Sequence, residues 1–189
     1  GAHPHIVTVY DIGEEDGQTY FVSEDMEGGS LHDLLERAAH HRLPLARALS
    51  IADHLCQALA HAHQCGIIHG DLRPSHVWLT QDGTAKLGGF GLVLSPDRAR
   101  FTLQGITADT VFYMPPEQIM ARRVDVGSDL YSLGAMLYEM VTGRPPFMGD
   151  IAGIISHHMT TPPAAPSRYY PEVPQTLDAL LLGLLAKAP

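Results

Sequence analysis

The chain has 189 residues, of which 45% are hydrophobic and 17% charged, and its formal net charge is −9. This length and composition predict a globular domain with a core of its own. The acidic balance disfavours nucleic acid and anionic lipid as main partners, because both require a basic face. No apolar run reaches the roughly 18 residues of a transmembrane helix, and no signal peptide is visible. Cys56 and Cys65 lie on one predicted helix at a spacing that disfavours a disulfide, so we expect a reducing compartment and a cytoplasmic protein.

The first half of the chain predicts two strands followed by two helices. Residues 6–13 and 18–25 alternate in the manner of strands around the turn signal EEDG, which predicts a hairpin. Ser30 and Asp33 have the spacing of a capping box, so a short helix is expected over residues 31–39. A longer helix is expected over residues 45–65, ended by Gly66. Its apolar residues recur at intervals of three and four: Leu45, Leu49, Ala52, Leu55, Leu59 and Ala62.

The second half is mainly helical. HVWLT and TAKLG flank the turn QDG and predict a second hairpin, whereas residues 88–116 have no clear period and predict a long ordered loop. Residues 125–142, which Gly143 ends, predict a central buried helix, because apolar residues occur on nearly every side. A short helix to about Met159, a proline-rich connector and a last helix opening at Thr176 complete the chain. The apolar stripe of the central helix is Leu130, Leu133, Leu137, Met140 and Val141.

Twelve histidines raise the alternative of a metal site. The densest group, HAHQCGIIH, contains His61 and Cys65 four residues apart on a predicted helix, with His69 after it. Structural zinc sites usually have tighter paired spacings and more ligands. A histidine-based site would require His61, Cys65, His69 or His76 to converge, and an ordinary structural role is the stronger expectation.

Six motifs in order give the chain a resemblance to a known family. HPHIV, YFVSEDMEGGSL, HGDLRPSH, GGFG, TVFYMPPEQ and DVGSDLYSLGAMLYEMVTGRPPF resemble successive segments of a eukaryotic-like protein serine/threonine kinase of the bacterial type. The resemblance implies an α+β, kinase-like fold, mostly the helical large lobe with the last strands of the small lobe. Residues 1–29 would be the end of the small lobe, hairpin and hinge, and residues 30–189 the large lobe, truncated before its C-terminal end.

The resemblance also implies roles for individual residues in phosphoryl transfer, which depends on positioning and on cations placed against the phosphate charge. Asp71 would be the catalytic base, and Arg73 would replace the lysine that neutralises the transferring phosphate. Ser23 would be the gatekeeper. Thr110 would face the catalytic aspartate on the substrate side. Residues that would contact the adenine of ATP are Glu24 and Met26, through their backbone, and Trp78, beneath the ring. Trp78 would either stack on the base or fill the pocket.

Four further residues would be structural. Asp129 would hold the catalytic loop through its backbone, and His69 would stack with Phe90 in the core that links the lobes. Glu117 belongs to the PPE motif, whose usual arginine partner has no counterpart in these 189 residues. The glycine-rich phosphate loop, the strand lysine and its partner glutamate also have no counterpart.

The pattern departs from the family at the two metal-ligand positions. His76 stands where an asparagine is expected and Gly89 where an aspartate is expected, and Mg²⁺ prefers oxygen ligands. Gly70 replaces the arginine that grips a phosphorylated activation loop. We therefore expect a pseudokinase that acts by binding or allostery, with weak or absent ATP binding and no metal. The alternative is an active, atypical serine/threonine kinase that uses ATP with Mg²⁺ or Mn²⁺. Either way the partner would be a protein substrate or a regulatory protein.

Overall fold

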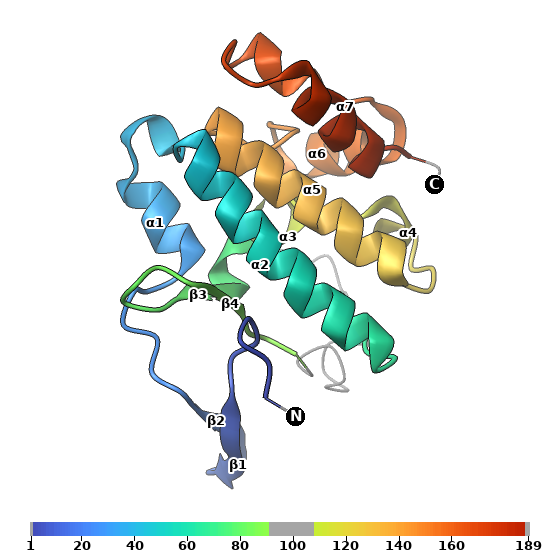
Figure 1. Ribbon diagram of the computed structural model, residues 1–189. Coiled ribbons are helices and arrows are strands. Elements are labelled where there is room, and N and C mark those ends of the chain that lie inside the picture. The colour runs from blue at the N-terminus through green and yellow to red at the C-terminus, as the bar shows by residue number, and fades with distance from the viewer. Residues whose placement is uncertain (1, 91–107, 188–189) are drawn as a thin grey trace.

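A computed structural model describes residues 2–90 and 108–187. A hairpin and a small two-stranded sheet lie beside a helical body (Figure 1). Within these described residues, 3₁₀ turns occur at Ala39–His41, Pro74–His76 and Pro166–Arg168. The strands are β1 (Val9–Glu15), β2 (Gln18–Ser23), β3 (Val77–Leu79) and β4 (Ala85–Leu87). The helices are α1 (Leu31–Arg37), α2 (Leu45–Gln64), α3 (Ala108–Val111), α4 (Pro116–Ile119), α5 (Val126–Thr142), α6 (Ile151–Thr160) and α7 (Gln175–Leu184).

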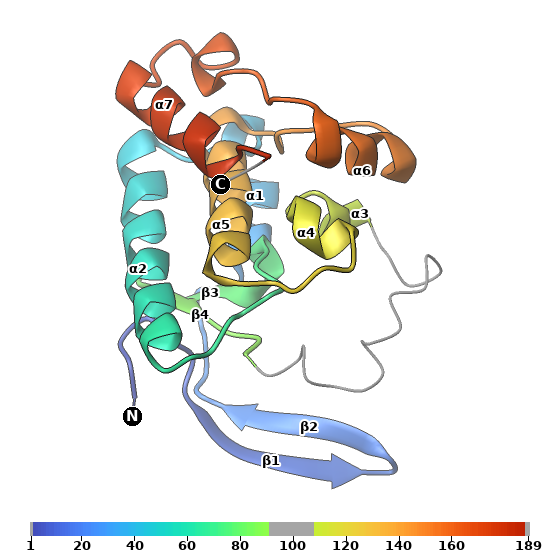
Figure 2. The same cartoon turned by 90° about the vertical axis from the view of Figure 1, so that its right-hand side faces the viewer.

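The first hairpin is confirmed, with shifted bounds. Strand β1 begins at Val9 and continues through the two glutamates that were assigned to the turn, so that Glu15 pairs with Gln18. The loop is therefore only Asp16 and Gly17, both with positive φ (51° and 77°), as the tightest hairpin turns require. The hairpin extends away from the helical body (Figure 2). The second hairpin, β3–β4, is also antiparallel and matches the prediction.

Helix α1 begins as predicted. The Ser30 side chain accepts the Asp33 N–H, and the Asp33 carboxylate accepts the Ser30 N–H at 3.0 Å, which completes the capping box. The helix ends at Arg37, two residues before the predicted end.

Helix α2 agrees with its predicted bounds, but its predicted buried face is wrong at one position. Leu49 is 42% exposed, and Leu45 is only partly buried. Small residues take up much of the buried face instead, since Ala48 and Ala58 are fully buried. The buried set is Ala48, Ile51, Ala52, Leu55, Ala58, Leu59 and Ala62.

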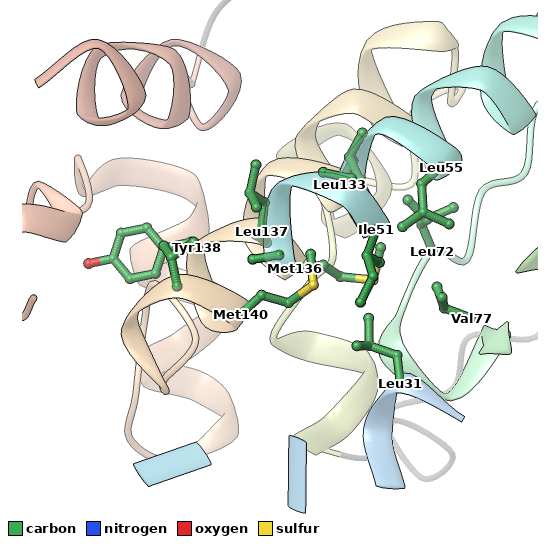
Figure 3. Close-up of a cluster of buried hydrophobic side chains, with 14 of the residues drawn as sticks. Leu31, Ile51, Leu55, Leu72, Val77, Leu133, Met136, Leu137, Tyr138 and Met140 are labelled. Atoms are coloured by element: carbon green, nitrogen blue, oxygen red, sulfur yellow. The ribbon is translucent and has the colours of Figure 1, made fainter. Parts of the chain in front are cut away.

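Helix α5 is the central helix, as expected: 13 of its 17 residues are buried. Asp125 caps its N-terminus by accepting the N–H groups of Gly127 and Ser128, and Gly143 ends it with φ of 81°. Leu130 departs from the predicted stripe, since it is 37% exposed. The core lies where α5, α2, α1 and β3 meet (Figure 3), with the labelled side chains of Leu31, Ile51, Leu55, Leu72, Val77, Leu133, Met136, Leu137, Tyr138 and Met140.

The segment predicted as one long loop, residues 88–116, contains helical structure. Helix α3 lies within it, and α4 begins at its end; residues 91–107 lie outside the described residues. Helix α7 begins at Gln175, one residue before the predicted start. Within the part of the chain that the structure covers, no helix is both long enough and apolar enough to cross a membrane.

Candidate active site

A cavity of about 680 Å³ lies between the β1–β2 hairpin, the β3–β4 sheet and the C-terminal end of α2. Most of its wall is apolar. It collects many of the residues that the sequence singled out, from three separate segments of the chain. Those residues are Ser23, Glu24, Met26, His76, Trp78, Gly89 and Phe90.

The segment after β2 contributes polar backbone to this cavity. The Glu24 N–H donates to the Thr8 carbonyl (3.0 Å), and the Glu24 carboxylate accepts the Thr8 N–H (2.7 Å) and the Lys86 ammonium (2.7 Å). Burial alone would raise the pKa of Glu24, but the bonds from Lys86 and Thr8 outweigh it and lower the pKa. Among the described residues the Met26 N–H has no hydrogen-bond partner. A ligand in the cavity therefore cannot use the Glu24 N–H, which is already committed, whereas the Met26 N–H is available to it.

Trp78 forms part of the cavity wall opposite this segment and is 37% exposed. Its indole lies against Gly88: a Cβ built on Gly88 would be 3.0 Å from Cδ1 and 3.1 Å from Nε1 of the indole. The glycine thus makes room for the tryptophan. An indole face that borders a cavity is a stacking platform for a planar ligand.

The loop that contains Asp71 is held by Asp129, the 1% exposed carboxylate on α5. Asp129 accepts the N–H groups of His69 (2.9 Å) and Gly70 (2.8 Å). Its third partner is His63, whose Nε2 lies 2.8 Å away. The sequence drew attention to His63 only as a member of the histidine-rich group HAHQCGIIH, and its contact with Asp129 was not predicted. His69 Nε2 donates to the Gly88 carbonyl (2.8 Å). Its ring meets Phe90 edge-on, with centroids 4.8 Å apart, so these side chains join α2, α5 and the segment after β4.

Asp71, Arg73, His76 and Thr110 form a second cluster beside the cavity. The Arg73 guanidinium donates to Thr110 Oγ1 (3.3 Å), and its Nε lies 3.8 Å from Asp71 Oδ2. His76 Nδ1 lies 2.7 Å from the Asp71 carbonyl oxygen. Because a carbonyl can only accept, Nδ1 carries the proton and Nε2 presents its lone pair to Arg73 Nη2 at 3.4 Å. Burial lowers the pKa of His76 and the charge of Arg73 lowers it further, whereas Asp71 raises it. The net effect is a lowered pKa, which favours the neutral ring.

His76 also occupies the space beside Gly89. A Cβ on Gly89 would lie 3.1 Å from Cγ and 3.2 Å from Nδ1 of the imidazole, and φ of Gly89 is +81°. A residue with a side chain at position 89 would therefore require the imidazole to move. The two positions at which the sequence departs from the family are in direct contact and compatible with each other.

Glu117 lies apart from both clusters. It lies in the first turn of α4, and its carboxylate accepts the hydroxyl of Ser128 on α5. This bond ties α4 to the start of the central helix. Neither Ser128 nor Lys86 stood out in the sequence, because each acts through a partner that is distant along the chain.

The proposed histidine metal site is not formed by the residues that the structure describes. Across 2–90 and 108–187, no group of three or more histidine, cysteine or acidic side chains is arranged to hold a metal ion. His61 and Cys65 border the cavity, whereas His69 is committed to the Gly88 carbonyl.

Comparisons with known proteins agree with this arrangement. The family model described as the protein kinase domain matches residues 1–189. The chain is 41% identical over 191 residues to the DNA damage-responsive serine/threonine-protein kinase RqkA of Deinococcus radiodurans, covering 98% of the chain and 28% of that protein. It is 38% identical over 196 residues to the serine/threonine-protein kinase PknB of Mycolicibacterium smegmatis, covering 99% and 31%. The chain thus spans less than a third of the length of these relatives. The crystal structure of the PknI kinase domain of Mycobacterium tuberculosis matches with a TM-score of 0.76 at 28% identity, over all of this chain and 65% of that one.

Proposed function

Since the chain belongs to the protein kinase family, and within it to the bacterial serine/threonine type, we propose that it is a catalytically impaired member, a pseudokinase. In this proposal the domain acts by binding a regulatory protein or by allosteric control, in the cytoplasm. The small lobe would end near residue 29 and the large lobe would fill the rest. Nucleic acid is not expected as a partner, given the net charge of −9.

The observation that carries the proposal is the double commitment of His76. Its Nδ1–H is bonded to the Asp71 carbonyl and its Nε2 faces the Arg73 guanidinium. Neither ring nitrogen is left to bind a cation, and a cation approaching Nε2 would meet the charge of Arg73. Gly89 has no side chain to offer. The family generally uses ATP with a divalent metal, and these two positions do not fit such an ion.

The loss of these two metal ligands should greatly reduce the rate of phosphoryl transfer. Groups that place charge against the developing transition state are commonly worth several kcal/mol each, or about a thousandfold in rate. The cavity itself still suits a planar heterocycle, with Trp78 as a stacking face and the Met26 N–H as a donor. We therefore expect any nucleotide to bind through its base and to bind equally with and without metal.

The alternative is an active, atypical serine/threonine kinase. It is favoured by the contact of Arg73 with Thr110, which would align the catalytic loop with the substrate-side segment, and by the intact Asp129 support under the loop. In that case Asp71 would accept the substrate hydroxyl proton and the metal would be Mn²⁺, for which imidazole is a better ligand, after His76 had turned away from Arg73.

Phosphate transfer from radiolabelled ATP distinguishes the two functions. The full-length protein is assayed in Mg²⁺ and in Mn²⁺, beside the double variant His76→Asn/Gly89→Asp and beside Asp71→Asn. A pseudokinase gives label with the double variant only. Label on the natural protein that disappears with Asp71→Asn overturns the proposal and supports the alternative.

Nucleotide binding is measured separately through Trp78, the single tryptophan of the 189 residues. Its fluorescence should change on addition of adenine nucleotides, with the same midpoint in magnesium and in a chelator. If the nucleotide concentration at the midpoint is much higher in the chelator than in magnesium, binding depends on metal and this expectation is contradicted. In the full-length protein, a Trp78→Leu variant identifies the part of the signal that comes from this residue.

A further inference from the structure

A second pocket, of about 270 Å³, lies between the connection from α1 to α2, the loop that follows Asp71 and the C-terminal end of α5. Arg73 belongs both to its wall and to the cluster around Asp71. The second pocket and the cavity beside Trp78 have no lining residue in common. The second pocket is therefore a separate site, built from α1 and the segments that follow it.

A buried carboxylate forms part of the wall of this second pocket. It belongs to Glu139, which is only 5% exposed. One of its oxygens accepts the Tyr113 hydroxyl, and the other lies 3.2 Å from His41 Nε2. Among the described residues no lysine or arginine lies within ion-pair distance of it, although buried charges in proteins are usually paired. Burial raises the pKa of Glu139 and the bonds from Tyr113 and His41 only partly oppose this, so a cation placed here would stabilise the charged carboxylate.

The two arginines in the wall of the second pocket are engaged by other groups. Arg73 donates to Thr110 Oγ1 (3.3 Å), and its Nε lies 3.8 Å from Asp71 Oδ2. The Arg144 guanidinium lies over the Tyr169 ring, 4.5 Å from its centroid. The acidic residues of the wall are Glu36, Asp109 and Glu139. The charge that the second pocket offers to a ligand is therefore negative.

The connection from α1 to α2 places His41 on this carboxylate through strained backbone. His40 and His41 are consecutive residues in the left-handed region, with φ of 59° and 55°, where a residue with a Cβ is strained. Such conformations persist only where surrounding contacts offset their cost. Here the His41 ring lies between two carboxylates, with Nε2 3.2 Å from Glu139 and Nδ1 3.5 Å from Glu36. The strain acts against these contacts, so the ring is held less tightly than an unstrained loop would hold it.

We propose that His41 is an internal plug: the strained connection holds its imidazole on Glu139, and a cationic side chain of a protein partner displaces it to reach that carboxylate. The protein partner is the one that the proposed pseudokinase function requires, so on this point the plug rests on that function. A guanidinium suits the place of the imidazole, because it is permanently charged and donates two parallel N–H groups to a carboxylate. The imidazole donates only one N–H to Glu139, and its departure relieves the left-handed strain.

Peptide binding to the full-length protein tests the proposal. The probes are a blocked peptide with one arginine between alanines and the same peptide with citrulline, the uncharged isostere of arginine. Their dissociation constants are measured by ligand-observed NMR without nucleotide, so a protein that does transfer phosphate can still show the plug. We expect the arginine peptide to bind about tenfold more tightly than the citrulline peptide. Glu139→Gln, which keeps an acceptor for Tyr113, should remove this difference. Equal binding of the two peptides by the natural protein and by His41→Gly, or a difference that survives Glu139→Gln, overturns the proposal.

Two glycine variants separate the effect of the ring from that of the strain. His41→Gly removes the ring, and glycine adopts the left-handed backbone without strain, so the arginine peptide should bind about tenfold more tightly than to the natural protein. His40→Gly relieves the strain at an exposed neighbour but keeps the ring, which stabilises the closed loop, so the affinity should be unchanged or lower. No rise with His41→Gly, or an equal rise with both variants, overturns the proposal. The melting temperature of each variant verifies that it is folded.

Discussion

The contact between Gly89 and His76 predicts that an aspartate cannot be restored at position 89 alone. The new Cβ would lie 3.1 Å from Cγ of a mostly buried imidazole that is bonded to the Asp71 carbonyl, so the ring must shift by a few tenths of an ångström. We estimate about 1–2 kcal/mol for this crowding. The left-handed backbone at φ +81° adds about 1 kcal/mol for a non-glycine residue. Gly89→Asp should therefore destabilise the domain by about 2–3 kcal/mol, or about 5–10 °C in melting temperature.

A double-mutant cycle with His76→Asn isolates the crowding. Asparagine removes the ring, so Gly89→Asp in that background should cost only the backbone contribution of about 1 kcal/mol. The expected coupling energy is about 1–2 kcal/mol, measured from urea unfolding of the four proteins. If the two substitutions add to within about 0.3–0.5 kcal/mol, the positions are independent and the argument from their contact is refuted.

Other contacts give predictions of their own. Asp129→Ala should cost about 3–5 kcal/mol in urea unfolding, because it leaves buried loop N–H groups without an acceptor; a cost below about 1 kcal/mol would contradict its role as the loop support. Burial and, after it, the charge of Lys187 lower the pKa of His158 to about 3, so its contribution to stability is present above about pH 6.5 and is lost toward pH 3. His158→Gln should reduce the acid slope of the unfolding free energy by about 1.4 kcal/mol per pH unit, and an unchanged slope would exclude His158 as a source of that slope. Lys86→Met should cost about 1–2 kcal/mol, because it leaves the partly buried Glu24 carboxylate without its cation, and adding Glu24→Gln should recover part of this; a double variant no more stable than Lys86→Met would argue against the pair.

Local signals in the sequence predicted most of the fold. The capping box at Ser30, the stop at Gly143 and the period of the central helix each depend on residues within a few positions of one another. The predictions were wrong where packing against a neighbouring element determines which residues are buried. Leu49 fits a helical period, yet it is 42% exposed, while alanines such as Ala48 and Ala58 take buried positions of α2.

For the candidate site, too, the sequence predicted some features and missed others. Motifs placed Glu24, Met26, Trp78, His76 and Gly89 around a common ligand position, and the structure brings them to one cavity. Their roles in binding and catalysis stay predictions. Several contacts that shape the site could not be foreseen, since they join residues that lie far apart along the chain.

Three such pairs matter most. His63 bonds to Asp129 across 66 positions, and Lys86 bonds to Glu24 across 62. The stacking of His3 on His61 likewise depends on how the N-terminal segment packs on α2. No periodic pattern in a single sequence encodes a contact of this kind, because the two partners come together only when the helices and strands have packed.

The β1–β2 hairpin has a practical consequence for work with these 189 residues. Six of its large apolar side chains are 44% to 67% exposed: Val9, Tyr10, Ile12, Tyr20, Phe21 and Val22. A two-stranded ribbon is only marginally stable in water on its own, and its exposed edges can pair with those of another copy. Concentrated preparations of the isolated polypeptide should therefore self-associate and scatter light through this hairpin, and charged substitutions at Tyr10 or Ile12 are the simplest way to keep it in solution.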